Sequence, residues 1–215
     1  MPLQVTTLSL GPIGTNCYLA ADSDSKQAVV IDPGWDAPQV LATAEKLGLS
    51  LQAIWLTHAH FDHIGGVAGL VRALNIPVAL HSLDLPLYRA RGGAMLWGIP
   101  LEPGPEPTIT LDQRISSGVG DWKLEVGSLK FEVFHVPGHT PGHVAFYEKA
   151  AGAIFGGDVL FQNSIGRTDL PGGNYETLIH SIQTHFLTLP DSTIVYSGHG
   201  PATTVGEERR FNPFL

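Results

Sequence analysis

Short apolar stretches alternate with turns that contain glycine and proline along the whole chain, and their spacing predicts strands and helices. In the first half, runs of β-forming residues predict strands over 3–10, 17–21, 27–31, 51–56 and 77–81, the first two forming a hairpin. Helical spacing predicts helices over 38–47 and 67–74, and a helical pattern over 83–98 that two glycines interrupt. Residues 99–108 contain four prolines and predict an extended loop, which either borders a pocket or is a plain solvated connection.

The second half of the chain follows a looser version of the same order. From 121 to 148 the apolar residues alternate with period two, and further strands are predicted over 144–147, 153–155 and 193–196. A helix is predicted over 174–187, and the residues from 201 to 215 are expected to form a short tail. Because the two similar blocks follow one another without a linker, we expect a single α/β (α+β) domain over residues 1–215, with two packed sheets inside and helices outside.

The composition is typical of a compact globular protein, with 43% hydrophobic and 15% charged residues. The 12 basic and 20 acidic side chains give a net charge of −8, which disfavours nucleic acid as a partner. The single cysteine, Cys17, excludes an intrachain disulfide and is expected to be a small buried side chain. The N-terminal residues show neither a signal-peptide pattern nor a run that could span a bilayer, so we expect a cytoplasmic protein without a membrane partner.

The most informative stretch is Thr57–Gly66, where three histidines and an aspartate follow the spacing H-x-H-x-D-H. The residues before it predict a buried strand, and those after it predict a helix. Since side chains alternate along a strand, His58 and His60 are expected to point to one side, with Asp62 and His63 at the entry to the helix. Imidazoles and a carboxylate without a thiolate suit Zn, Fe or Mn and argue against a structural zinc knot. The stretch therefore predicts a metal site.

Three later residues share the features of this first cluster. His139 lies in a loop of proline and glycine, and Asp158 and His199 each follow a buried strand beside glycine. With the four earlier residues they make seven candidate ligands, too many for one four-coordinate ion and suited to two ions that share a carboxylate. Asp32, at the end of an earlier strand, has two interpretations: it initiates a turn, or it orients a ligand imidazole.

Five motifs together resemble those of the metallo-β-lactamase superfamily and, within it, the glyoxalase II-like hydrolases. In chain order they are Asp32-Pro33-Gly34, THAHFDHIGG at 57–66, PGHTPGH at 137–143, GGD at 156–158 and SGHG at 197–200. The resemblance implies a four-layer αββα sandwich with the site at one edge of its two sheets. It also implies two divalent ions per chain, with zinc as the first expectation and iron or manganese as alternatives. The ligands it implies are His58, His60 and His139 for the first ion, Asp62, His63 and His199 for the second, and Asp158 as the bridge.

The chemistry of such a pair indicates hydrolysis. Two ions about 3.5–4 Å apart lower the pKa of a bound water and supply a bridging hydroxide near pH 7, which we expect to attack an acyl carbonyl. Asp158 would set the separation of the ions, and Asp62 would orient the nucleophile. A thiolate, with a conjugate-acid pKa of about 8.5, leaves without a strong general acid, whereas an amide nitrogen needs protonation. Because no candidate acid accompanies the ligands, we expect a thioester or another activated ester as the substrate.

The family's substrate-binding part is expected to be missing. Full-length glyoxalase II proteins carry a C-terminal helical domain whose basic residues bind glutathione, whereas here residues 200–215 are all that follow His199. The chain more closely resembles the short glyoxalase II-like hydrolases, including its segment Ser164–Asp169, and S-D-lactoylglutathione is a suitable trial substrate. Arg167 either binds an anionic substrate group or pairs with Asp169 in a structural turn. Three further side chains are expected in the core or behind the ligands: His81, His143 and Tyr147.

Other functions on the same scaffold stay open. A persulfide dioxygenase would use one mononuclear iron, although that family often has cysteine at the position of His143. A lactonase would use the same chemistry on a small-molecule ester. A flavodiiron-type electron carrier would have a carboxylate in place of His60 and a flavin domain, which this sequence lacks. A non-catalytic binding module would be expected to have lost a ligand, and none of the seven is lost. The sequence leaves the oligomeric state open.

Overall fold

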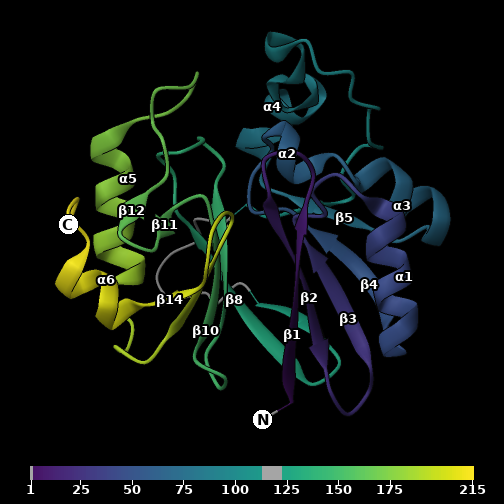
Figure 1. Ribbon diagram of the computed structural model, residues 1–215, viewed down its shortest axis with the longest axis horizontal. Coiled ribbons are helices and arrows are strands. Elements are labelled where there is room, and N and C mark those ends of the chain that lie inside the picture. The colour runs from purple at the N-terminus through teal and green to yellow at the C-terminus, as the bar shows by residue number, and fades with distance from the viewer. Residues whose placement is uncertain (1, 113–122) are drawn as a thin grey trace.

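Two six-stranded sheets pack face to face in the computed structural model, which describes residues 2–112 and 123–215 (Figure 1). The first sheet has the order β1 (Leu3–Leu10), β2 (Thr15–Asp22), β3 (Gln27–Ile31), β4 (Ser50–Trp55), β5 (Val78–Leu80), β6 (Ile109–Thr110). The second has the order β14 (Thr203–Thr204), β13 (Ile194–Ser197), β10 (Ala153–Gly157), β9 (Val144–Glu148), β8 (Leu129–His135), β7 (Lys123–Val126). Residues 121 and 122, where the predicted run of strands starts, lie outside the described residues.

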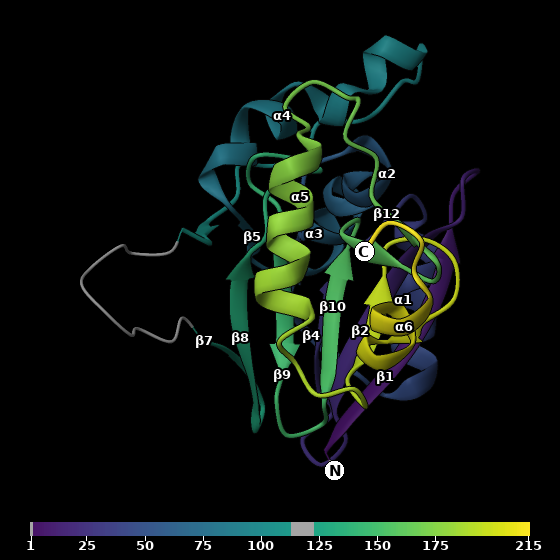
Figure 2. The ribbon, with the colours of Figure 1, turned by 90° about the vertical axis from the view of Figure 1, so that its left-hand side faces the viewer.

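Helices cover both outer faces and complete the expected four-layer αββα sandwich (Figures 1 and 2). On one side, α1 (Ala37–Leu47) and α3 (Val67–Leu74) pack on the first sheet. On the other, α5 (Tyr175–Ser181) and α6 (Val205–Phe211) lie against the second. Helix α1 has Pro38 in its first turn and ends at Leu47, and Gly48 follows it with a φ of 65°, the left-handed conformation that suits glycine after a helix.

Three apolar cores hold the four layers together, and strand alternation decides which side chain enters which core. In β2, Cys17 and Leu19 pack toward α1 and α3, whereas Tyr18 and Ala20 face the second sheet. The core between the sheets is rich in aromatic rings, including Trp55, Phe131, Phe146 and Phe155. The expected buried position of Cys17 is thus confirmed, and burial raises the pKa of its thiol, which argues against a nucleophilic role.

The connections are less regular than the sequence pattern predicts. The helical pattern over 83–98 is divided into η1 (Ser82–Asp84), α4 (Leu85–Arg89) and η2 (Arg91–Trp97), with positive φ angles at Gly92 and Gly93. The helix expected over 174–187 is α5 followed by a π-helical turn, η3 (Ile182–Phe186). A small hairpin, β11 (Leu160–Phe161) and β12 (Ser164–Ile165), was not predicted.

The expectation of a plain tail after residue 200 is wrong. Residues 203–211 form β14 and α6, and the hydroxyl of Thr204 accepts the N–H of Glu207 as the N-terminal cap of α6. The buried Glu208 accepts the N–H of Asn163 at 2.8 Å, so this segment is held against the rest of the fold. Among the described residues, no helix is both long and apolar enough to cross a membrane.

The sheets bring the candidate residues together because several of their strands run parallel. β3, β4 and β5 are parallel neighbours in the first sheet, and β10 and β13 are parallel neighbours in the second. Asp32, His58, Asp158 and His199 each follow one of these strands at its carboxyl end. In open α/β sheets this is the edge where ligands bind.

Candidate metal centre

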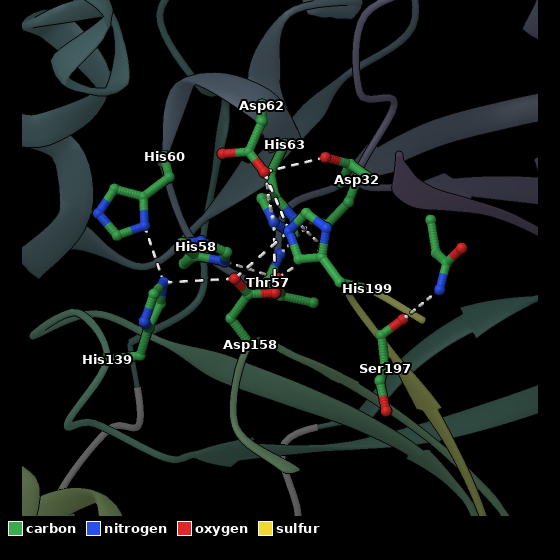
Figure 3. Close-up of polar contacts among 12 residues, drawn as sticks. Asp32, Thr57, His58, His60, Asp62, His63, His139, Asp158, Ser197 and His199 are labelled. Atoms are coloured by element: carbon green, nitrogen blue, oxygen red, sulfur yellow. Dashed lines mark hydrogen bonds and ion pairs between the residues drawn. The ribbon is translucent and has the colours of Figure 1, made fainter. Parts of the chain in front are cut away.

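The H-x-H-x-D-H stretch forms a tight corner between β4 and α2 (Phe61–Ile64). β4 ends at Trp55, so His58 and His60 lie on the connection and not on the strand itself. His60 is the residue before α2, and Asp62 and His63 lie in its single turn, as the sequence predicts. All four side chains are buried and lie in one cluster with His139, Asp158 and His199 (Figure 3).

The first group of candidate ligands is made of three histidines from both halves of the chain. The rings of His58, His60 and His139 have centroids 4.6–4.9 Å apart, and Nδ1 of His60 lies 2.8 Å from Nε2 of His139. The Nδ1 N–H of His139 donates to the carbonyl of Arg167 at 2.8 Å, which leaves Nε2 as a lone-pair donor facing the group. Each of the three histidines offers one ring nitrogen, and these nitrogens lie within 4.8 Å of one another, close enough to hold one metal ion.

The second group lies beside the first and combines Asp62, His63 and His199. Oδ2 of Asp62 is 3.3 Å from Nε2 of His63 and 3.1 Å from Nε2 of His199. The same carboxylate oxygen accepts the hydroxyl of Thr15 at 2.9 Å. A carboxylate and two imidazoles form the second potential site of three ligands.

Asp158 lies between the two groups (Figure 3). Its Oδ1 is 3.4 Å from Nε2 of His63, and its Oδ2 is 3.6 Å from both Nε2 of His139 and Nε2 of His199. The Asp158 carboxylate thus approaches nitrogens of both groups, although the loop that carries it carries no other candidate ligand.

Asp32 supports the corner from β3. Its Oδ1 accepts the N–H of Thr57 at 2.8 Å, and its Oδ2 accepts both the Thr57 hydroxyl at 2.6 Å and Nδ1 of His63 at 2.9 Å. Because a carboxylate can only accept, Nδ1 of His63 carries a proton, and Nε2 is the nitrogen that faces the centre. Asp32 therefore lies behind a candidate ligand and does not merely initiate a turn.

The chemistry of the donor set fits metal ions. Nε2 of His58, Nε2 of His63 and Oδ1 of Asp158 are buried without a hydrogen-bond partner among the described residues. Buried polar atoms are normally paired, because an unpaired one costs free energy. Three such atoms aimed at one small volume are satisfied when cations occupy it.

The pKa shifts run in opposite directions in the two groups: those of His58 and His60 are lowered, and that of His63 is raised. Burial, together with the neighbouring imidazoles, lowers the pKa of His58 well below its ordinary value and that of His60 to about 3. Burial also acts against the charged form of His63, but the carboxylates of Asp62 and Asp158 outweigh it and hold its pKa well above the ordinary value. In turn, His63 counteracts the burial of these two carboxylates and lowers their pKa. His58 and His60 are thus neutral lone-pair donors near pH 7, whereas the ionised carboxylates of Asp62 and Asp158 favour a positive charge on His63 beside them.

The remaining predicted residues lie around the centre. His143 is buried, stacks on His58 with centroids 4.7 Å apart, and accepts the N–H of Asp158 through Nε2 at 3.0 Å. Tyr147 is in the core under α5, and His81 stacks on His135 outside both groups. The guanidinium of Arg167 forms two hydrogen bonds of 2.7 Å to Asp169 at the surface, while its carbonyl contacts His139.

Two supporting residues were missed in the sequence. Thr15 precedes no recognised motif, although it follows a turn and starts a buried strand. Asp84 is a fully buried carboxylate in η1 that contacts both ligand-bearing loops, and no spacing signal marks it.

Comparisons with known proteins found a matching family model, a similar relative and two similar solved structures. The profile of the Metallo-beta-lactamase superfamily matches residues 10–199. Hydroxyacylglutathione hydrolase GloC of Haemophilus influenzae is 41% identical over 93% of this chain and 92% of its own. The crystal structure of BLEG-1, a B3 metallo-beta-lactamase, has a TM-score of 0.90 at 43% identity and covers 99% of both chains. The crystal structure of TTHA1623 in a di-iron-bound form has a TM-score of 0.86 at 44% identity, covering 98% of this chain and 100% of that one.

Proposed function

Since the chain belongs to the metallo-beta-lactamase superfamily, we propose that it is a metal-dependent thioester hydrolase with two divalent ions. The observation that carries the proposal is the position of Asp158, whose two oxygens lie within 3.6 Å of nitrogens from both histidine groups. The proposed ligands are His58, His60 and His139 for one ion, Asp62, His63 and His199 for the other, and Asp158 for both. We treat residues 1–215 as one domain, because each half supplies ligands.

The donor set indicates a class of metal ions and not one metal. Imidazole and carboxylate ligands accept Zn, Fe or Mn, and we propose zinc first, with iron or manganese as alternatives. The similarity to TTHA1623, whose structure is described as di-iron-bound, keeps iron a specific alternative.

A bound pair of divalent ions supplies a water of lowered pKa and polarises a carbonyl oxygen. The chain's own residues make that chemistry possible. Asp158 sets the distance between the two groups, and Asp32 and the carbonyl of Arg167 hold His63 and His139 with their lone pairs inward. Asp62, which also accepts the Thr15 hydroxyl, is proposed to orient the attacking water by hydrogen bonding.

A thioester is favoured over an amide because a thiolate leaves without a proton from the protein. The similarity to a hydroxyacylglutathione hydrolase supports a small acyl-thiol substrate. Arg167 is proposed to bind an anionic group of that substrate, because half of its side chain is exposed beside the loop that carries His139. A guanidinium suits a carboxylate through two parallel hydrogen bonds.

The test combines metal analysis of the purified protein with a thiol-release assay on S-D-lactoylglutathione. We expect about two metal ions per chain and rapid thiol release. Asp158→Ala should abolish release and reduce bound metal, whereas Asp36→Asn, at an exposed position, should change neither. Full activity of the Asp158 variant would contradict the two-ion proposal.

Other substrates distinguish the related functions. One iron per chain with oxygen consumption and no thiol release would identify a persulfide dioxygenase. Two ions with hydrolysis of a lactone alone would identify a lactonase. A β-lactam is a necessary comparison because BLEG-1 is described as a beta-lactamase, and preferential cleavage of it would replace the thioester in this proposal.

A further inference from the structure

Asp84 joins the two loops that carry the first group of candidate ligands. It lies in η1, immediately after β5, and is fully buried. Its Oδ2 accepts the N–H of Ala59 at 3.0 Å and the hydroxyl of Thr140 at 2.8 Å, and its Oδ1 accepts the N–H of Gly142 at 2.6 Å. Ala59 lies between His58 and His60, and Thr140 directly follows His139.

These contacts connect the two halves of the molecule at one point. The loop with Ala59 leaves the first sheet, and the loop with Thr140 and Gly142 joins two strands of the second. A Cβ atom at Gly142 would lie 2.6 Å from the backbone nitrogen of Asp84, so the segments approach backbone to backbone. A change in the Asp84 side chain would therefore move the loops relative to one another.

All three partners of Asp84 donate, so the ionised carboxylate matches them with both of its oxygens. An asparagine of the same shape keeps one accepting oxygen and places an amide N–H₂ against a donor. Hydrogen bonds that hold the atoms behind metal ligands typically contribute about 10–100-fold to metal affinity.

We propose that Asp84 is a positioning residue that sets the distance between His139 and the His58–His60 pair, and thereby the metal affinity of this group. The inference rests on the proposed metal centre. It differs from a general contribution to folding because it concerns one group of ligands. Within residues 2–112 and 123–215, Asp84 forms no hydrogen bond or ion pair with Asp62, His63 or His199, and its hydrogen bonds go to the loops that carry the other three.

The experiment measures the two stepwise Zn²⁺ affinities of metal-free protein in competition with a chromophoric chelator. His139→Ala and His199→Ala identify which affinity belongs to which group. In Asp84→Asn we expect the affinity that His139→Ala removes to fall about 10–100-fold, with the affinity that His199→Ala removes unchanged. The thermal unfolding midpoint of each metal-free variant is recorded alongside.

Glu208→Gln is the matched control. Glu208 is also a buried carboxylate that accepts several hydrogen bonds from separate segments, donated by Asn163, Thr203 and Asn212, but it lies in α6. We expect this variant to lose thermal stability without a change in either affinity. Equal affinities in Asp84→Asn and wild type, or an equal fall of both affinities, would overturn the inference while leaving the two-ion centre intact. Wild-type protein that binds no Zn²⁺ would overturn the proposed centre first, and the inference with it.

A second pair of variants decides the question if Asp84→Asn does not fold. Thr140→Val removes one donor to Asp84 and leaves the amides of Ala59 and Gly142 in place, and Thr140→Ser restores the hydroxyl. We expect Thr140→Val to weaken the His139 group selectively and Thr140→Ser to recover its affinity. Identical affinities in the two Thr140 variants would overturn the inference.

Discussion

The Nδ1 atom of His63 lies 2.9 Å from Oδ2 of Asp32, and this contact joins the end of β3 to the turn of α2. Asp32 has a φ of 50°, a left-handed conformation that aspartate and asparagine adopt more readily than most residues. The backbone at this position is thus bent so that one short carboxylate reaches both Thr57 and His63. The side chain and the unusual φ angle serve the same contact.

Asp32→Asn should therefore weaken the second group without distorting the chain. Asparagine tolerates the φ angle but cannot accept on both side-chain atoms, so the orientation of His63 becomes less well defined. We expect about a 10–100-fold loss of metal affinity for the Asp62, His63 and His199 group, and a similar loss of kcat. Zn²⁺ titration and steady-state kinetics measure both, with Asp36→Asn as a control. Unchanged affinity would mean that Asp32 acts only as a turn residue.

Asp22, at the opposite end of the sheets, is expected to make a pH-dependent contribution to the free energy of unfolding. Its carboxylate accepts the N–H groups of Ser128 and Asp24, and the bond from Ser128 is foremost among the causes that lower its pKa from 3.8 to about 2. A lowered pKa means that the unfolded chain binds the proton more readily. The stabilisation is therefore fully present above about pH 4 and disappears as the pH falls toward 2.

Urea unfolding of wild type and Asp22→Asn at several pH values tests this dependence. We expect the wild type to be the more stable of the two at pH 5–7, with a difference that shrinks steadily below about pH 4. A difference that stays constant down to pH 3 would show that the hydrogen bonds of Asp22, and not its charge, carry the effect.

Phe155 allows the contribution of the core between the sheets to the free energy of unfolding to be tested. It is fully buried, and its ring lies 5.3 Å from Tyr18, 5.0 Å from Tyr196 and 6.2 Å from Phe131. Phe155→Ala should destabilise the protein by about 3–5 kcal/mol, because it removes apolar burial and leaves a cavity between two sheets that cannot close. Urea unfolding of the metal-free protein measures the loss. Phe211→Ala, at a residue that is 64% exposed, should stay within about 0.5 kcal/mol of wild type.

The parts of the fold that the sequence predicted are those with a strict period. Both faces of β2 are buried, and its alternating side chains enter two different cores, which leaves a continuous apolar run in the sequence. The H-x-H-x-D-H spacing likewise reflects a single tight corner, so neighbours in sequence are neighbours in space. The positions of His139, Asp158 and His199 were suggested by glycine and strand ends, but their meeting depends on the packing of the sheets.

The parts that the sequence did not predict depend on long-range contacts. α6 is short and charged, and its apolar residues do not repeat, so the sequence analysis expected a tail in its place. Asp84 looks like an ordinary acidic residue of a short turn, because its partners lie 25 and more residues away. The π-turn after Ser181 also carries no local signal, since an ordinary α-helix has the same apolar spacing.

Arg167 provides the test of substrate recognition. Its guanidinium binds Asp169 at the surface, while its backbone carbonyl, which no side-chain substitution removes, holds His139. Arg167→Ala should therefore preserve metal content and kcat but raise KM about threefold to tenfold for a thioester with a free carboxylate. A thioester without charge should show no change. Asp169→Asn frees the guanidinium from its partner and should lower KM for the anionic substrate. An equal KM increase for both substrates would show that Arg167 shapes the loop through its pair with Asp169 and does not bind the substrate's charge.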